Sequence, residues 1–510
     1  MNKPDYCTLI LARRSSVQKN QLILTSLHTM ENPNTAIAAL FNTSSNEQID
    51  RIEKIPQSGS DRAYYRIYTT AQTTYIATIS NNLKENDTFI AFTNHFKAVG
   101  AKVPSIFAVN DDGHIYIQED VGSDALLDIL EAEGKTDRVF NLYCKSLKAL
   151  AHLQIQGDKG LDYHQCLTSH EFGHQAIMSD LLYFKYYFLD TLKIPYDKSL
   201  LLSDFDQLAH HLSDASHRYF MFRDFQSRNI MVRGDDIHFI DYQGGMKGAL
   251  QYDVASLLWQ AKSNLSDEWK EKLLAHYMDC VQEELNEPID KNFFEEQYYG
   301  YVLIRLLQVL GAYGFRGLFE RKAHFLSSIP LALKNLSWFV KHKSTGVVPE
   351  FFNSLLQKVV DEKTIQQFDI IRATPQTPLV VKINSFSYLQ NGYPKDETKN
   401  GGGFVFDCRG ILNPGRIEEY KKQSGQDKPV KEYLEQQTLM PKFLNSIYDI
   451  VDIAVENYLE RGFESLEINF GCTGGQHRSV YAAEAMNRHL QNKFGVSTIL
   501  QHLNKSNWVV

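Results

Sequence analysis

The sequence predicts a bilobal α+β fold, in which a small β-rich lobe precedes a larger helical lobe, followed by a smaller α/β domain. Residues 55–79 and 103–118 hold short apolar stretches of strand length, separated by turn residues. From Leu126 onward most apolar residues recur at helical spacing. Near residue 470 an apolar run leads into a glycine-containing loop and then a helical pattern. At 510 residues the chain is too long for one hydrophobic core, so two or three domains are expected.

The order of elements in the small lobe follows from the spacing of its apolar residues. Phe89, Phe92 and Phe96 recur at helical spacing, and the stretches on either side of them have strand length. We expect helices over residues 35–55 and 85–99, and strands over 55–67, 74–79, 103–109 and 114–118. In the helical lobe, Ser266 followed by two acidic residues predicts the N-cap of a helix.

Composition predicts four segments. The apolar residues near the N-terminus precede Arg13 and Arg14, which is the wrong order for a secretory signal. We expect either that the native start is Met30 or that the preceding residues form a disordered leader. The expected segments are a leader over residues 1–29, the bilobal domain over 30–345, a linker over 346–378 and the α/β domain over 379–510.

Bulk charge and cysteine usage exclude several classes of protein. A net charge of −8 argues against bulk electrostatic binding to nucleic acid or to an anionic membrane. The six cysteines form no closely spaced pair, which argues against a disulfide framework or a zinc ribbon and favours a reducing cytoplasm. The most apolar segment, residues 301–315, is interrupted by Arg305 and predicts a buried helix rather than a membrane span.

One short motif carries the chemistry of the bilobal domain. Asp224 is followed five positions later by Asn229, and Asp241 stands at the end of an apolar run twelve residues further on. ATP-dependent phosphoryl transfer needs one carboxylate that orients the attacking hydroxyl, and an amide oxygen and a second carboxylate that hold Mg²⁺. The flanking residues 218–222 and 237–240 predict a loop between two short strands. ATP and Mg²⁺ are therefore the expected cofactors.

Two further segments belong with this motif. Ser58, Gly59 and Ser60 fall in a predicted β-turn whose backbone N–H groups would cover the nucleotide phosphates. Glu119 follows a predicted strand, where a connection between the lobes would contact adenine. Residues 252–258, which include Asp253, open a helix after Asp241.

Together these motifs resemble the aminoglycoside/choline phosphotransferase-like kinases, which have a protein-kinase-like fold. In particular, the sequence resembles the branch that contains bacterial anomeric kinases of N-acetylmuramate and N-acetylglucosamine, and the resemblance runs from about residue 35 to 340. The resemblance implies that Asp224 is the catalytic base, that Asn229 and Asp241 bind Mg²⁺, and that Asp253 braces the catalytic loop. It implies an ATP-dependent sugar kinase, with an alcohol group as the acceptor.

The sequence departs from this family at two positions. Phe222 stands where many relatives have His, two residues before the catalytic Asp. The strand over residues 74–79 has no Lys to contact the α- and β-phosphates. Arg62 or Arg66 is a candidate substitute, and either is equally compatible with a solvated strand position. Glu85, the usual partner of that Lys, remains in the helix that follows.

The α/β domain contains its own candidate anion site. Residues 468–480 read as a strand, a loop of small residues and a helix that begins near Arg478. Backbone amides at the loop and the helix N-terminus, together with His477 and Arg478, make a phosphate cradle. The candidate phosphosugar-binding residues are Arg409, Cys472, Thr473, Gly474, Gly475, His477, Arg478 and Ser479.

Residues 379–510 resemble the C-terminal domain of the RapZ family of bacterial adaptor proteins, through Phe406-Asp-x-Arg409, Asn413-Pro414 and the run from Gly471 to Val480. The resemblance implies a sensor of glucosamine-6-phosphate. The chain has Gln and Asn near residue 390 where relatives tend to carry Lys and His, so the ligand is expected to differ. The P-loop and the basic tail of that family are absent, so we do not expect RNA binding.

A rival interpretation of the same loop comes from Cys472 and Arg478. Their C-x-x-x-x-x-R spacing, with Ser479 next, is the loop pattern of tyrosine phosphatases, in which a thiolate attacks phosphorus. The favoured interpretation of Cys472 is a small buried residue.

The two halves together predict a cytoplasmic amino-sugar kinase with a C-terminal phosphosugar sensor. The competing class is a regulatory adaptor of RapZ type, whose pseudokinase lobe only binds nucleotide. We expect a small-molecule sugar substrate, a phosphosugar ligand and no membrane partner. The oligomeric state stays open, a homo-oligomer included.

Overall fold

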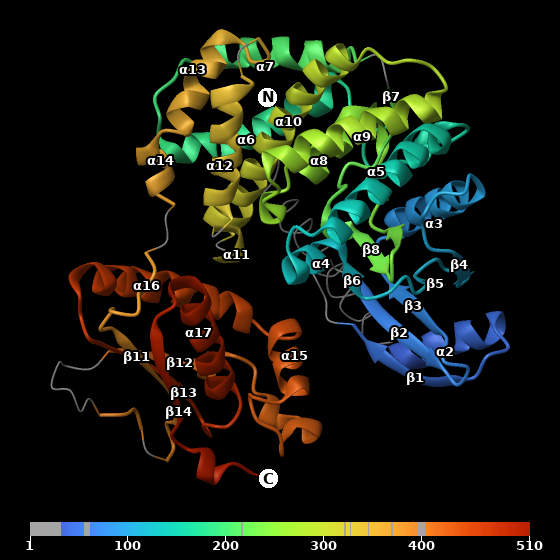
Figure 1. Ribbon diagram of the computed structural model, residues 1–510. Coiled ribbons are helices and arrows are strands. Elements are labelled where there is room, and N and C mark those ends of the chain that lie inside the picture. The colour runs from blue at the N-terminus through green and yellow to red at the C-terminus, as the bar shows by residue number, and fades with distance from the viewer. Residues whose placement is uncertain are drawn as a thin grey trace, which may run out of the picture. The chain divides into compact units, whose positions relative to one another are not determined.

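The computed structural model describes residues 32–55, 62–215, 218–320, 323–326, 328–344, 346–368, 371–390, 392–395 and 403–509. The chain divides into two compact units: Met1–Ser179 with Phe205–Arg305, and Asp180–Asp204 with Leu306–Val510. A β-rich sheet, a helical body and a separate α/β domain with a parallel sheet follow one another along the chain (Figure 1), and this confirms the predicted fold class.

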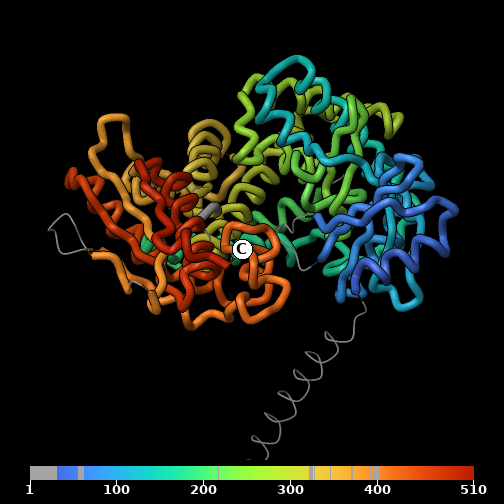
Figure 2. Tube along the Cα trace, turned by 90° about the horizontal axis from the view of Figure 1, so that it is seen from below, coloured from blue at the N-terminus to red at the C-terminus, as the bar shows by residue number. Residues whose placement is uncertain are grey.

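The first unit begins with a five-stranded antiparallel sheet in the order β1-β2-β3-β5-β4, at the blue end of the trace in Figure 2. Alternate residues of β5 point to opposite faces, because side chains alternate along a strand. Ile115 and Ile117 pack with Ile37 and Phe41 of α2, whereas Tyr116 contacts Phe89 of α3. The elements are α2 (Pro33–Ser44), β1 (Ile49–Lys54), β2 (Ala63–Thr69), β3 (Thr74–Ile79), α3 (Leu83–Ala98), β4 (Ile106–Val109) and β5 (Ile115–Glu119).

The helix expected over residues 35–55 is only half correct. The helix α2 ends at Ser44, and residues 49–54 form β1. Ile52 pairs with Ile67 of β2 across an antiparallel ladder. Pairing with a neighbouring strand thus overrides the helical spacing that the local sequence shows.

The helical body supports the candidate catalytic loop. The predicted cap is present, because the Ser266 side chain accepts a hydrogen bond from the backbone N–H of Trp269 at 3.3 Å. The helices of this body are α4 (Leu126–Glu133), α5 (Asp137–Asp158), α8 (Leu250–Leu258) and α9 (Asp267–Leu285). Three further helices, α6 (His174–Tyr187), α7 (Lys198–Ser213) and α10 (Lys291–Tyr313), contribute residues to both units.

Short strands frame the segment that carries the catalytic motif. The two-stranded sheet pairs β7 (Arg218–Met221) with β10 (Met246–Ala249). The three-stranded sheet has the order β6-β8-β9, with β6 (Asp124–Ala125), β8 (Ile230–Arg233) and β9 (Asp236–Phe239). The motif loop lies between β7 and β8, and the β8–β9 hairpin, which the sequence did not predict as a separate pair, leads to Asp241.

One helix in the described part of the chain, Lys291–Phe319, passes a length and composition test for crossing a membrane. Its apolar window has a mean hydropathy of 1.4, and 56% of that window is buried inside the protein. Near its middle, Arg305 is buried and bonded to the hydroxyl of Tyr252. Because a core helix passes the same test, the result is weak evidence for a membrane span.

The second unit holds the helices α11 (Ala323–Leu326), α12 (Ile329–His342), α13 (Glu350–Val359) and α14 (Glu362–Gln366), and then the α/β domain. That domain is built on a parallel sheet in the order β12-β13-β11-β14. Its core includes Ile383, Ile468, Phe470 and Met486. Its elements are β11 (Val380–Ser387), β12 (Phe404–Asp407), α15 (Lys428–Gln436), α16 (Met440–Arg461), β13 (Ser465–Cys472), α17 (Arg478–Phe494) and β14 (Ser497–His502).

Candidate functional site

Asp253 on α8 braces the loop that carries Asp224 by hydrogen bonds with the loop backbone. The two carboxylate oxygens of Asp253 accept hydrogen bonds from the backbone N–H groups of Phe222 at 2.7 Å and Arg223 at 3.0 Å. Gln154 donates to the same carboxylate at 2.9 Å. Asp253 is fully buried, and burial raises its pKa to about 7 against the opposing effect of these hydrogen bonds. The brace fixes the backbone in front of Asp224, where Arg223 has a φ of 76°.

Asp224 presents its carboxylate to solvent. Its side chain is 36% exposed and accepts hydrogen bonds from Gln226 at 2.5 Å and from Arg228 at 3.0 Å. Both partners lie on the same loop, four residues or fewer away. The carboxylate is thus oriented locally and remains accessible to a small molecule.

Asn229 and Asp241 are brought together by the backbone. The N–H of Ile240 donates to the carbonyl oxygen of Asn229 at 3.1 Å, so the residue before Asp241 is tied directly to Asn229. The side-chain amide of Asn229 donates to the Asp224 carbonyl at 2.9 Å, which turns its amide oxygen away from that bond. Asp241 has a φ of 70° and accepts a hydrogen bond from Gln243 at 2.8 Å.

The structure separates the two arginines that compete for the place of the missing Lys. Arg62 is 5% exposed, forms an ion pair with Glu85, and places its Nη1 3.9 Å from Oδ1 of Asp241. Arg66 instead pairs with Asp120, with 2.7 Å between its Nε and a carboxylate oxygen. Of these two arginines, Arg62 is therefore the one that contacts the carboxylate of Glu85 on α3 and approaches Asp241.

Glu119 ends β5, and its side chain points to the start of β4. Its carboxylate accepts hydrogen bonds from the backbone N–H and the hydroxyl of Ser105, both at 3.1 Å, and lies 3.5 Å from the ammonium of Lys97. Burial opposes these contacts, which nevertheless lower the pKa of Glu119. The predicted phosphate-covering residues Ser58, Gly59 and Ser60 lie outside the described residues.

Phe222, which stands in place of the usual His, is completely buried. Its ring packs edge-on against the rings of Phe225, Phe239 and Tyr242. Aromatic packing therefore supports the loop where relatives use a polar side chain.

A buried group beside the loop was not identified from the sequence. The hydroxyl of Tyr252 accepts hydrogen bonds from Arg223 at 2.7 Å and from Arg305 at 3.3 Å. Arg305 comes from α10, about eighty residues along the chain from the catalytic motif. Its only signal in the sequence was a charge inside an otherwise apolar helix, which predicts burial but no partner.

The second candidate site lies at the carboxyl ends of the parallel strands, where ligands bind in open α/β sheets. Arg478, the first residue of α17, is 4% exposed. Its guanidinium donates to the carbonyl oxygens of Arg409 and Ile411 at 3.1 and 2.7 Å, and to the hydroxyl of Thr473 at 3.3 Å. Its Nε is buried with no protein hydrogen-bond partner among the described residues. Among the described residues no side chain caps the start of α17, so the first-turn amides have no capping side-chain acceptor there.

Cys472 and Ser479 lie beneath this loop. The Sγ of Cys472 is 3.1 Å from the Ser479 hydroxyl and accepts a hydrogen bond from the backbone N–H of Gly475 at 3.3 Å. Both side chains are buried. Gly475 has a φ of 66°, a conformation that favours glycine. The small residues of the motif thus let the chain fold tightly around the sulfur.

His477 and Arg409 are oriented by neighbours of their own. His477 Nε2 donates to the Tyr420 carbonyl at 2.9 Å, and burial lowers the pKa of this imidazole. Arg409 forms an ion pair with Asp407 at 2.7 Å and places its guanidinium 4.1 Å from the centre of the Tyr388 ring. Arg409 is exposed, whereas His477 is buried.

Comparison with known families places a domain over each site. Residues 51–284 match the phosphotransferase enzyme family, and residues 379–505 match the RapZ C-terminal domain. The chain therefore carries a phosphotransferase-family domain followed by a RapZ C-terminal domain, which confirms the resemblance to these two families and does not test the amino-sugar kinase branch.

The relatives found by sequence match less than a third of this chain. A nucleotide-binding protein of Fervidobacterium nodosum is 39% identical over 150 residues, which are 29% of this chain and 47% of that protein. A nucleotide-binding protein of Clostridium botulinum strain Okra is 37% identical over 118 residues, 23% of this chain and 38% of that protein. The chain thus spans less than half the length of these relatives.

Solved structures of kinases resemble a larger share of the chain at low identity. Choline kinase from Cryptosporidium parvum is 15% identical and covers 61% of this chain and 94% of its own, with a TM-score of 0.42. An amicoumacin kinase in complex with AMP-PNP, Ca²⁺ and Ami is 12% identical and covers 65% and 99%, with a TM-score of 0.44.

Proposed function

We propose that the phosphotransferase-family domain transfers the γ-phosphoryl group of ATP to the anomeric hydroxyl of an amino sugar. The observation that carries this proposal is the pairing of Arg62 with Glu85, next to Asp241. It supplies a buried cation where the family's strand Lys is missing, so the loop that carries Asp224 has the charge needed to hold a nucleotide. The proposed location of the protein is the cytoplasm.

The residues present fit Mg²⁺ as the cofactor. Mg²⁺ prefers oxygen ligands and is held by one or two carboxylates together with substrate phosphates. The amide oxygen of Asn229 and the free carboxylate oxygen of Asp241 are of this type, and the Ile240–Asn229 backbone bond keeps the two residues adjacent. The bound ion would neutralise charge on the nucleotide phosphates.

Arg62 would contact the α- and β-phosphates in place of Lys. A guanidinium offers a fork of donors that matches phosphate oxygens, and it stays charged at any physiological pH. Glu85 holds one edge of the guanidinium, and Gln243 donates to Glu85 at 3.4 Å from the side of the Asp241 loop. This network positions the cation before the nucleotide binds.

Asp224 would accept the proton of the sugar hydroxyl as the phosphoryl group transfers. Its carboxylate is accessible, and Gln226 and Arg228 orient it from the same loop. The Asp253 brace holds the backbone of Arg223 directly before it. Proton acceptance therefore depends on a carboxylate with a fixed direction and an open face.

The RapZ C-terminal domain is proposed to bind a phosphosugar at Arg478. The buried Nε of Arg478, the uncapped first turn of α17 and the hydroxyl of Thr473 surround one loop. Helix N-termini and arginines are the usual partners of phosphate. Cys472 and Ser479 would support the loop from below, and Arg409 would reach the ligand from the exposed side. The bound phosphosugar would then regulate the kinase.

Incubation with ATP, Mg²⁺ and a panel of amino sugars, followed by phosphorus NMR, tests the kinase proposal. We expect a new sugar-phosphate signal that falls about 100-fold or more in rate in Asp224→Ala. Asp235→Ala is the matched control, because Asp235 is an exposed carboxylate on the neighbouring hairpin that pairs with Arg138. Saturable ATP binding without turnover of any sugar would favour the adaptor.

Thermal-shift titration with glucosamine-6-phosphate tests the second site. We expect a rise in melting temperature that is weakened in Arg409→Ala and in Arg478→Lys. Arg416→Ala is the control, because Arg416 is exposed in the same segment. A shift that is equal in all three variants would exclude this loop as the binding site.

A further inference from the structure

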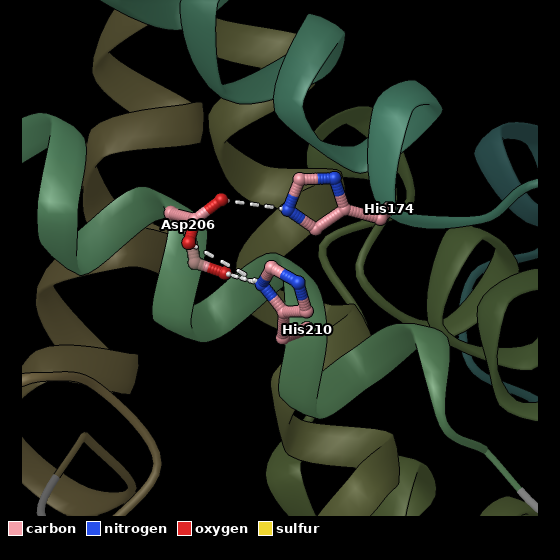
Figure 3. Close-up of side chains that lie close together, drawn as sticks. All are labelled: His174, Asp206 and His210. Carbon is pink, nitrogen blue, oxygen red and sulfur yellow. Dashed lines mark hydrogen bonds and ion pairs between the residues drawn. The ribbon is translucent and has the colours of Figure 1, made fainter.

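Two histidines and an aspartate from two helices converge at a place that the proposed reaction does not use. His174 is the first residue of α6, and Asp206 and His210 lie one turn apart on α7. Residues at i and i+4 face the same side of a helix. Figure 3 shows the two imidazole rings next to each other, both facing Asp206.

The three side chains already have nearly the spacing of a metal site. His174 Nε2 is 2.9 Å from one carboxylate oxygen of Asp206, and His210 Nδ1 is 3.4 Å from the other. One ligand atom from each of the three residues lies within 4.8 Å of the other two. The centres of the two imidazole rings are 4.1 Å apart. Only small side-chain movements would place these atoms about 2 Å from a common ion.

We propose that His174, Asp206 and His210 bind a divalent transition-metal ion of the Zn²⁺ class. Two imidazole nitrogens and one carboxylate oxygen are the donor types that Zn²⁺ selects, whereas Mg²⁺ and Ca²⁺ prefer oxygen alone. Three protein ligands leave a fourth position for water. The exposed fractions of the three side chains, between 32% and 65%, give both the ion and that water access.

The alternative explanation is an ion pair in which Asp206 is shared by two protonated imidazoles. One observation favours the metal. Two imidazolium ions whose ring centres are 4.1 Å apart would repel each other, whereas neutral imidazoles converge on a cation without that cost.

Metal binding through His210 would compete with a hydrogen bond that this side chain already makes. Its Nδ1 donates to the carbonyl oxygen of Asp206 at 2.9 Å. Coordination through Nδ1 requires the proton to leave that nitrogen, by a shift to the tautomer protonated on Nε2, because the ligand form of histidine is the neutral ring.

The ion would clip the start of α6 to the middle of α7. His174 follows Phe172 by two residues, and the Phe172 ring lies 4.5 Å from the guanidinium carbon of Arg223, which precedes Asp224. The bound metal would thus cross-link His174 to Asp206. This link would lie two residues from Phe172, which packs against Arg223 in the proposed catalytic loop. A ligand that binds only the folded protein stabilises it by mass action.

Titration of the tag-free full chain with Co²⁺, read by its visible absorption, and with Zn²⁺, read by calorimetry, tests the proposal. We expect one ion per chain at this site, with about tenfold or greater loss of affinity in His174→Ala and in His210→Ala. Asp206→Asn should weaken binding as well, because it removes the anionic ligand while it keeps the side chain's shape.

The matched control is His211→Ala, since His211 is exposed on the same helix next to His210. It should leave the affinity and the stoichiometry unchanged. No saturable binding to the wild-type chain, or binding that His174→Ala and His210→Ala do not weaken, would overturn the proposal. Circular dichroism of each variant separates loss of a ligand from loss of the fold. Because the readout is metal binding, its outcome is independent of whether the domain phosphorylates a sugar.

Discussion

The guanidinium of Arg62 forms an ion pair with the carboxylate of Glu85 and approaches Asp241 to 3.9 Å. Arg62 directly precedes β2, Glu85 lies in the first turn of α3 and Asp241 lies in the segment after β9. Three segments of the proposed nucleotide site are therefore linked through one buried cation.

Arg62→Ala should reduce kcat/KM for ATP about 100-fold, because it removes a preorganised cation from the phosphates. Arg66→Ala is the control, since Arg66 pairs with Asp120 instead. Steady-state kinetics with varied ATP, and nucleotide binding by calorimetry, measure the effect. Equal losses in the two variants would show that neither arginine acts specifically on the nucleotide. Arg62→Lys should recover part of the affinity, because it keeps the charge but not the fork of donors.

The buried carboxyl of Asp253 should make the stability of the domain depend on pH. Burial raises its pKa from 3.8 to about 7, while the hydrogen bonds from Phe222 and Arg223 oppose the shift. The folded protein therefore keeps a proton that the unfolded chain releases near pH 4. This group's contribution to the free energy of unfolding should fall as the pH rises from about 4 to about 7, and then stay constant.

Urea unfolding of the wild type and of Asp253→Asn across that range measures the contribution of Asp253. Asp253→Asn has no carboxyl group at this position, so its free energy of unfolding should lack the pH dependence that Asp253 contributes to the wild type. It should also be less stable throughout by about 1–3 kcal/mol, because one backbone N–H loses its acceptor. Asp235→Asn, on the exposed hairpin, should keep the wild-type slope. The same slope in all three proteins would contradict the assignment.

The order of the lobes, and the position of the loop that carries Asp224 between short strands, were predictable because they depend on local patterns. One short segment between apolar runs holds Asp224, Asn229 and Asp241. The helix after Ser266 was predicted from a local capping pattern, and the cap is present. The strand β1 was mistaken for helix, because its pairing with β2 is not local and edge strands alternate weakly.

Contacts between residues far apart in the sequence could not be predicted either. The choice between Arg62 and Arg66 depends on which arginine meets Glu85 and which meets Asp120. The hydrogen bond between Arg305 and Tyr252 joins residues 53 positions apart. The convergence of His174 with Asp206 and His210 joins two helices, and His174 and Asp206 lie 32 positions apart in the sequence. Each contact is set by packing, and no local spacing encodes it.

Phe222→His should destabilise the phosphotransferase-family domain, even though it restores the residue that many relatives carry. The site is enclosed by the rings of Phe225, Phe239 and Tyr242, and the Tyr242 hydroxyl already shares a hydrogen bond of 2.5 Å with the hydroxyl of Thr93. Burying a polar group without a hydrogen bond costs about 1–3 kcal/mol. Chemical denaturation measures the change. Phe107→His, at a position that is 52% exposed, should be nearly neutral. An unchanged unfolding free energy in Phe222→His would show that the pocket rearranges to admit the imidazole.

Two glycines near the proposed phosphosugar site, Gly471 in β13 and Gly474 in the loop that follows, should respond differently to alanine. A Cβ at Gly471 would stand 2.4 Å from ring atoms of both Phe386 and Tyr388, whereas a Cβ at Gly474 meets nothing within 4 Å. Gly471→Ala must therefore shift the end of β11 or β13, at a cost of about 1–3 kcal/mol. Gly474→Ala should leave the melting temperature nearly unchanged. If a phosphosugar lies against the backbone of this loop, the new methyl group should still weaken its binding, and the thermal shift with glucosamine-6-phosphate measures that loss. A stable Gly474→Ala variant with a full thermal shift would place the phosphosugar away from Gly474. Equal stability of the two variants would mean that the rings of Phe386 and Tyr388 move to admit the new methyl group at position 471.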